Sequence, residues 1–154
     1  MKLIRGDCLE VMKKMPGGSI DLTVTSPPYD NLRTYNGTLE WGPHVWKRVI
    51  SELYRITKAG GVVVWVVGDA TVKGSETGTS FKQALWFMDC GFNLHDTMIW
   101  EKQTFTATGS LQIRYASVFE YMFVLSKGKP KSFNPIKDKP NKSVGKKKHG
   151  TVRQ

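Results

Sequence analysis

Two cysteines, no metal-ligand spacing and no long apolar run set the first limits on this 154-residue chain. Cys8 and Cys90 are isolated, with no C-x-x-C pair and no histidine cluster, so a disulfide framework and a zinc site are not predicted. Reduced thiols favour a cytoplasmic setting. No apolar run approaches the length of a membrane span, and the start of the chain lacks a signal-peptide core. A phosphate-binding G-x-x-x-x-G-K-[ST] loop is also missing.

Acidic residues are scarce at the carboxyl end. Residues 1–125 hold 13 Lys and Arg against 12 Asp and Glu, whereas residues 126–154 hold ten against one. Nearly all of the net charge of +10 therefore lies in the last part of the chain. This part could bind nucleic-acid phosphates, or it could be a flexible, solvated tail that its prolines keep from packing. The charge pattern predicts a domain over 1–126 and a basic tail over 127–154.

Helical and strand patterns alternate along the domain. We expect a strand at 3–5, a helix from Asp7 to about Met15, and a strand at 20–25. A helix from Pro43 to Gly60-Gly61 and an apolar strand at 62–67 follow. A further helix, capped by Thr79 or Ser80, should run to Cys90. Strands near 93–101 and 117–126 are too close for a helical crossover and should pair antiparallel. This order predicts half of a doubly wound α/β sheet.

The most informative segment is Ser26-Pro27-Pro28-Tyr29, directly after the strand at 20–25. Two prolines fix φ and remove two N–H donors, so nearby carbonyls have no ladder to join and can accept hydrogen bonds from a ligand. Ser26 adds a hydroxyl and Tyr29 an aromatic face. An acceptor-rich cup with a stacking wall suits a flat molecule with an amino group, such as a flipped nucleobase. This segment should lie at the carboxyl end of a central strand and line an open cleft.

The motif and its context resemble a known family. Ser26–Tyr29 match the (D/N/S)PP(Y/F) motif of the DNA methylase N-4/N-6 family in its permuted β-class order. Gly6–Glu10 resemble the GD-x-L-E segment of that family, Asp21–Thr25 its catalytic strand, and Leu53–Gly61 its L-x-R-V-L-K-P-G-G segment. The resemblance covers roughly residues 1–134. It implies a Rossmann-like methyltransferase sheet, mostly parallel with a C-terminal antiparallel pair of strands.

The resemblance also implies a reaction and its site residues. Ser26, Pro27, Pro28 and Tyr29 would hold an adenine or cytosine amino group for methylation by S-adenosylmethionine. Asp7, with Cys8 beside it, would bind the cofactor; the alternative for Asp7 is a plain helix cap. Asp69 is interpreted as a cap or supporting residue, and Glu120 as solvent-facing or paired.

DNA is the implied partner, and its candidate contacts lie in loops and in the tail. Arg33, Tyr35 and Arg114 lie in polar loops with interleaved aromatics, which suit nucleic acid but are also typical of ordinary solvated loops. Lys146, Lys147 and Lys148 are candidate phosphate contacts in the tail. A bacterial or phage-encoded origin is also implied.

The family's glycine-rich F-x-G-x-G turn is missing from these residues. We therefore expect the catalytic part of a longer or split enzyme, completed by a C-terminal part or by a self-associating copy. The missing strand would lie between 3–5 and 20–25, which should leave 20–25 as an exposed edge. The leading function is a DNA methyltransferase, with cytosine N4 slightly favoured over adenine N6 because the motif begins with Ser. An RNA or protein-amide methyltransferase and a non-catalytic nucleic-acid-binding remnant remain alternatives.

Overall fold

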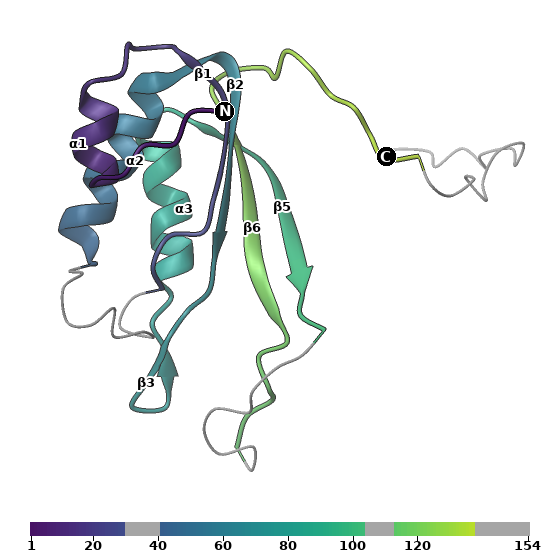
Figure 1. Cartoon of the computed structure of the whole chain (residues 1–154). Helices are drawn as coiled ribbons and strands as arrows, with labels where there is room; N and C mark the ends of the chain where they lie inside the picture. Colours follow the sequence, from purple (N-terminus) through teal and green to yellow (C-terminus); the bar gives the residue numbers. More distant parts are fainter. Residues whose placement is uncertain (30–40, 104–112, 138–154) are drawn as a thin grey trace, which may run out of the picture.

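The computed structural model describes residues 1–29, 41–103 and 113–137. Figure 1 shows the helices beside a twisted sheet and a small hairpin below it. The elements are α1 (Cys8–Lys13), β1 (Ile20–Thr25), α2 (Pro43–Ile56), β2 (Thr57–Val67), β3 (Thr71–Val72), β4 (Ser75–Glu76), α3 (Thr79–Asp89), β5 (Asn93–Glu101) and β6 (Phe119–Ser126). Among these residues no helix is long and apolar enough to cross a bilayer.

The main sheet has the strand order β1-β2-β6-β5. β1 and β2 pair in parallel, whereas β6 pairs antiparallel with both β2 and β5. The α/β class and the antiparallel pairing of β5 with β6 are confirmed. The described sheet holds fewer parallel pairings than expected, because β6 enters between β2 and β5. β1 is an edge strand here, as the missing turn predicted, and is therefore not the central strand that the motif alone suggested.

Two expected elements differ from the structure. Leu3–Arg5 form no strand and are exposed, since no described strand offers them a ladder. Helix α2 ends at Ile56, not at Gly60-Gly61, because Thr57 turns into the extended region and its hydroxyl donates to the Leu53 carbonyl. The two glycines lie within β2 instead. Gly60 has a φ of +79°, and a Cβ on Gly61 would lie 2.9 Å from Thr57 Cγ2.

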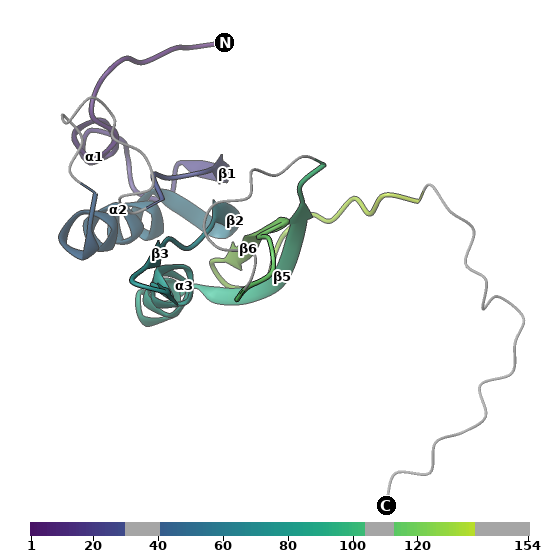
Figure 2. The same cartoon turned by 90° about the horizontal axis from the view of Figure 1, so that it is seen from below.

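The core lies between the sheet and the helices, which cover one face (Figure 2). Helix α2 buries an apolar stripe at the spacing of a helix: Trp46, Val49, Ile50, Leu53 and Ile56. These side chains pack on the alternate residues of β2 and β6 that face the helices: Val63, Trp65, Val67, Phe123 and Leu125. Trp65 also donates its indole N–H to Gln83 of α3 at 2.8 Å. The sheet and the helices therefore share one hydrophobic core.

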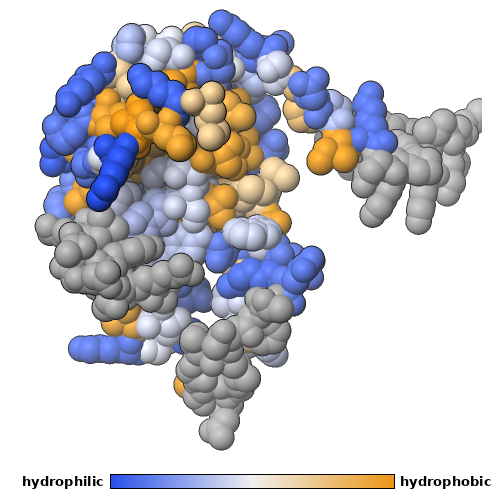
Figure 3. Space-filling view, viewed as in Figure 1, coloured by the Kyte–Doolittle hydropathy of each residue, from blue (hydrophilic) through white to orange (hydrophobic). Residues whose placement is uncertain are grey.

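The opposite face of the sheet is apolar and uncovered by any described helix. Strand alternation and the ladder register place Leu22, Val24, Val62, Val64, Met98 and Met122 on this face. Leu22 and Val24 are 59% and 65% exposed, and Met98 is 49% exposed. Figure 3 shows hydrophobic patches on the visible surface of the molecule. In doubly wound α/β folds, helices cover both faces of the sheet.

The predicted boundary at residue 126 coincides with the end of β6. The chain beyond it still contacts the sheet, because the Gly60 N–H donates to the Lys127 carbonyl and the Lys127 N–H donates to the Gly61 carbonyl. Lys127 Nζ also donates to the carbonyls of Tyr54 and Thr57 at 2.6 and 3.0 Å. The division into domain and tail stays a prediction.

Candidate active site

The Ser-Pro-Pro-Tyr motif leaves the carboxyl end of β1 and separates two cavities. Pro27 is buried, Pro28 and Tyr29 are half-buried, and Ser26 is exposed. On one side, Ser26, Pro27 and Pro28 line a cavity together with Trp41 and residues of α1, β1, α2 and β2: Cys8, Met12, Thr23, Thr25, Val49, Leu53 and Trp65. On the other side, Tyr29 lines a second cavity. The predicted cleft at the motif is therefore present.

The second cavity, of about 120 Å³, lies at Tyr29 between β4, β6 and the residues that directly follow β2. Its lining includes Tyr29, Gly68, Asp69, Glu76, Lys102 and Glu120. The Tyr29 hydroxyl donates to Glu120 Oε2 at 2.5 Å and lies 2.9 Å from Ser26 Oγ. Lys102 Nζ lies 3.9 Å from the other Glu120 oxygen. Of the two interpretations of Glu120, the paired one is therefore confirmed. Its link to Tyr29 was not anticipated, and the carboxylate within an apolar strand was the available signal.

Asp69, at the end of β2, organises the wall of this second cavity. Its Oδ1 accepts from the Ser80 backbone N–H at 2.9 Å and from the hydroxyls of Thr77 and Thr79 at 3.3 and 3.2 Å. Its Oδ2 accepts from the Ser80 hydroxyl. Although Gly78 precedes the first turn of α3, the cap is supplied by this distant carboxylate. The capping interpretation of Asp69 is confirmed, and Thr79 and Ser80 are partners of the cap rather than its source.

The candidate cofactor residues lie across the motif from Tyr29. Asp7 and Cys8 share a broad cavity with Pro28, Trp41 and Arg48. Asp7 also caps α1, since its Oδ1 accepts from the Glu10 backbone N–H at 3.0 Å. Burial, and then the charge of Asp7, raise the pKa of the Cys8 thiol, which favours its neutral form.

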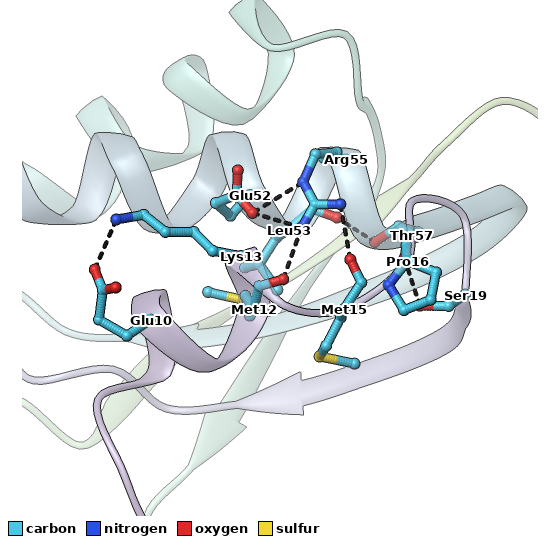
Figure 4. Close-up of polar contacts among 10 residues, drawn as sticks. All are labelled: Glu10, Met12, Lys13, Met15, Pro16, Ser19, Glu52, Leu53, Arg55 and Thr57. Atoms are coloured by element: carbon cyan, nitrogen blue, oxygen red, sulfur yellow. Dashed lines mark hydrogen bonds and ion pairs between the residues drawn. The ribbon is translucent and has the colours of Figure 1, made fainter.

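Arg55 of α2 fixes the position of α1 (Figure 4). Its guanidinium donates to the carbonyls of Met12 and Met15 at 2.6 and 2.9 Å and to Glu52 at 2.8 and 2.9 Å. Met12 lies in the last turn of α1 and Met15 lies two residues beyond its end, so the guanidinium adds to the few backbone hydrogen bonds that the helix end makes by itself. Arg55 therefore holds the helix whose first residues line the candidate cofactor cavity.

The described residues fit part of a bound S-adenosylmethionine. The carboxylates Asp7 and Glu10, the Cys8 thiol and the Trp41 ring line the cavity, which suits the adenine and ribose end of that molecule. A glycine-rich turn for its amino-acid end is missing from the sequence. No cluster of three or more metal-binding side chains occurs in the described parts of the chain.

Of the candidate DNA contacts, Arg114 lies among the described residues. Arg114 donates to Thr71 Oγ1 at 3.2 Å and to the Gly74 carbonyl at 2.5 Å, so it braces the β3–β4 hairpin beside the Tyr29 cavity. Arg33, Tyr35 and Lys146–Lys148 lie outside the described residues. Their roles stay predictions.

Comparison with known proteins agrees with this geometry. The N6_N4_Mtase family of DNA methylases matches residues 20–154. The orphan methyltransferase M.BamHII of Bacillus amyloliquefaciens is 54% identical over 149 residues, covering 97% of this chain and 50% of the relative. The type II methyltransferase M.ScaI of Streptomyces caespitosus is 37% identical over 86 residues, covering 54% of this chain and 28% of the relative.

Solved structures show the same fold. The PvuII DNA methyltransferase, described as cytosine-N4-specific, superposes with a TM-score of 0.68 at 25% identity, covering 83% of this chain and 50% of that one. A DNA modification methylase of Thermus thermophilus, in complex with S-adenosyl-L-methionine, superposes with a TM-score of 0.61 at 29% identity, covering 90% of this chain and 57% of that one. The chain thus spans about half the length of M.BamHII and of the PvuII enzyme. With its motif at the end of β1 and its match over most of the sequence, the chain belongs to the N6/N4 family of DNA methylases.

Proposed function

We propose that this chain is the base-binding, catalytic half of an S-adenosylmethionine-dependent DNA amino-methyltransferase. The observation that carries this proposal is the position of Ser26–Tyr29. They lie at the end of β1, between the cavity at Asp7 and Cys8 and the cavity at Glu120. The motif can therefore contact a base on one side and the cofactor on the other.

The motif suits the chemistry of an exocyclic amine. The lone pair of such a nitrogen is delocalised into the base, which makes it a poor nucleophile. The Ser26 hydroxyl and the Pro27 carbonyl can accept its N–H bonds and favour a pyramidal nitrogen. The Tyr29 ring can stack on the base, and such stacking contributes about 1–3 kcal/mol per base. The cofactor, when bound, supplies an electrophilic methyl group.

Cytosine N4 is the amino group that we propose as the target. Ser at the first motif position is the feature that favours cytosine over adenine. The similarity to the PvuII enzyme, which is described as cytosine-N4-specific, supports the same choice. DNA is proposed as the substrate because the relatives are DNA methylases, and the basic end of the chain could bind its phosphates.

We further propose that the uncovered sheet face binds the remaining half of such a methyltransferase domain. That half would pair a strand with the open edge of β1 and lay helices over Leu22, Val24 and Met98. An exposed apolar edge is a template for added strands. The match to M.BamHII covers 50% of that relative, and its unmatched half is the kind of polypeptide that we propose for this face. A second copy of this chain is the competing occupant.

A chimera tests both proposals. The chain is fused to the part of M.BamHII that lies outside the matched region, and the two pieces are also mixed as separate proteins. We expect weak or no S-adenosylmethionine binding by residues 1–154 in calorimetry, and methyl transfer to DNA by the chimera. Mass spectrometry of the digested DNA should show N4-methylcytosine. Detection of N6-methyladenine instead would show that the target base is adenine and not cytosine.

Variants of the chain distinguish a failure of the catalytic proposal from a failure of the proposed occupant of the sheet face. Tyr29→Ala should abolish transfer in the chimera while its cofactor binding remains. The pair Leu22→Ser and Val24→Ser should prevent reconstitution from separate pieces. A chimera that binds cofactor and DNA but transfers no methyl group would refute the catalytic proposal. Tight cofactor binding by residues 1–154, or a discrete dimer in sedimentation that these serine variants dissociate, would refute the proposed occupant.

A further inference from the structure

The catalytic motif is hydrogen-bonded to a carboxylate 91 positions away in the chain. Glu120 lies on β6, opposite Trp100 of β5, and its Oε2 accepts from the Tyr29 hydroxyl at 2.5 Å. Its side chain is 16% exposed, and Lys102 Nζ lies 3.9 Å from its Oε1. Glu120 is paired with Trp100 one position beyond the last pairing of β6 with β2, which is at Tyr121. The ladder to β5 and the ion pair with Lys102 position this carboxylate beside the loop that carries the motif.

The directions of these hydrogen bonds follow from the chemistry of the three side chains. A carboxylate can only accept, so the Tyr29 proton points at Glu120. Ser26 Oγ lies 2.9 Å from the same phenol oxygen, and either atom could donate on distance alone. Because the Tyr29 proton is committed to Glu120, Ser26 must donate its own proton to Tyr29. The Ser26 lone pairs then act as acceptors at the motif.

We propose that Glu120 acts through Tyr29 to hold Ser26 as a hydrogen-bond acceptor, so that the site selects bases with an amino group. The inference rests on the proposed function, since it deepens the base site described there. A serine by itself can donate or accept, and as a donor it would equally suit an oxo group. The charged chain Lys102–Glu120–Tyr29 removes that ambiguity. Glu120 is thus a positioning residue that need not touch the base.

Pairs of nucleosides in which this group is exchanged test the proposal. The full chain is titrated by NMR with deoxycytidine against deoxyuridine, and with deoxyadenosine against deoxyinosine. Each pair exchanges an amino group for an oxo group, and the adjacent ring nitrogen gains a proton in the same exchange. We expect about tenfold tighter binding of the amino nucleoside in at least one pair, because a mismatched donor or acceptor is left unpaired. Glu120→Gln and Tyr29→Phe should reduce this preference to about threefold or less.

The controls separate the effect of Glu120 from a loss of folding or a general change of charge in the cavity. Glu76 is a second carboxylate in the same cavity, and Glu76→Gln should keep the preference. Ser26→Ala should lose it, because the acceptor itself is removed. Amide spectra of each variant check that it is folded. If Ser26→Ala loses the preference while Glu120→Gln and Tyr29→Phe retain it, the inference is wrong and the base site still stands.

A second measurement needs no ligand. The ¹³C shift of Tyr29 Cζ reports whether the phenol donates to a carboxylate. The chemical shift should differ from that of the unmodified chain in Glu120→Gln and should be unchanged in Glu76→Gln. An unchanged chemical shift in Glu120→Gln would overturn the inference. Absence of binding to all four nucleosides, with the Cζ shift behaving as expected, would instead count against the proposed base site.

Discussion

Removing the Asp69 carboxylate should destabilise the fold rather than the chemistry. In Asp69→Ala, helix α3 loses the acceptor of the Ser80 N–H, and a lost N-cap costs about 0.5–2 kcal/mol. The Ser80 hydroxyl also loses its acceptor, and Ser80 is fully buried, at 0% exposure. A buried polar group without a partner costs about 1–3 kcal/mol. The expected loss is therefore about 2–4 kcal/mol, a large part of the 5–15 kcal/mol typical of a domain.

The assay is urea unfolding followed by the fluorescence of the five tryptophans, among them Trp65, which is buried and bonded to Gln83 of α3. Asp69→Asn keeps the acceptor for the Ser80 N–H, and the Ser80 hydroxyl can turn to accept from the new amide, so its loss should be about 1 kcal/mol. Asp96→Ala is the matched control. Its side chain is 63% exposed and has His95 at 3.8 Å, so removal should change stability by less than about 0.5 kcal/mol.

The structural role of Asp69 would be refuted by one combination of results. If Asp69→Ala unfolds within about 0.5 kcal/mol of the unmodified chain, the carboxylate is not an important cap. If the same variant also abolishes methyl transfer by the chimera, Asp69 acts on the reaction itself.

Three further predictions concern α1, Cys8 and the tail. Arg55→Met removes the donors to the Met12 and Met15 carbonyls, so the amides of α1 should exchange faster with deuterium; unchanged protection would contradict the anchoring role. Burial raises the pKa of the Cys8 thiol, so less thiolate forms at neutral pH. Alkylation of Cys8 by iodoacetamide near neutral pH should therefore be slower than that of free cysteine and should rise with pH; an equal rate would contradict the shift. Truncation after residue 134 removes seven of the ten basic residues of the carboxyl end. The slope of log K against log salt for DNA binding should then flatten by about 0.9 for each phosphate that the tail no longer neutralises, and an identical slope would rule out a phosphate-binding arm.

The sequence predicted the elements whose patterns are local. The apolar stripe of α2, the continuous apolar run of β2 and the short link between β5 and β6 each follow from neighbouring residues. The Ser-Pro-Pro-Tyr motif is equally local, because two prolines restrict the backbone wherever they occur. The end of α2 was misplaced for the same reason. Gly60-Gly61 is a common helix stop, but the Thr57 hydroxyl bond to Leu53 and the pairing of β2 with β1 ended the helix earlier.

The sequence also predicted that β1 lies at the edge of the sheet. The missing glycine-rich turn implied a missing strand, and β1 is an edge strand in the structure. The strand predicted at Leu3–Arg5 does not form, for a related reason. A strand exists only where a neighbour pairs with it, and no pattern within three residues can show whether that neighbour is present.

Tertiary structure alone decided which polar groups meet. Asp69 was recognisable as a possible cap, but only the fold carried its carboxylate to Ser80, eleven positions along. Glu120 appeared as an acidic interruption in an apolar strand, with no sign of what it would face. The entry of β6 between β2 and β5 set its register, and that register brought Glu120 to Tyr29. Local sequence determines the types of groups available to this site, whereas strand order and register determine which of them are hydrogen-bonded to one another, because that pairing depends on residues far apart in the chain.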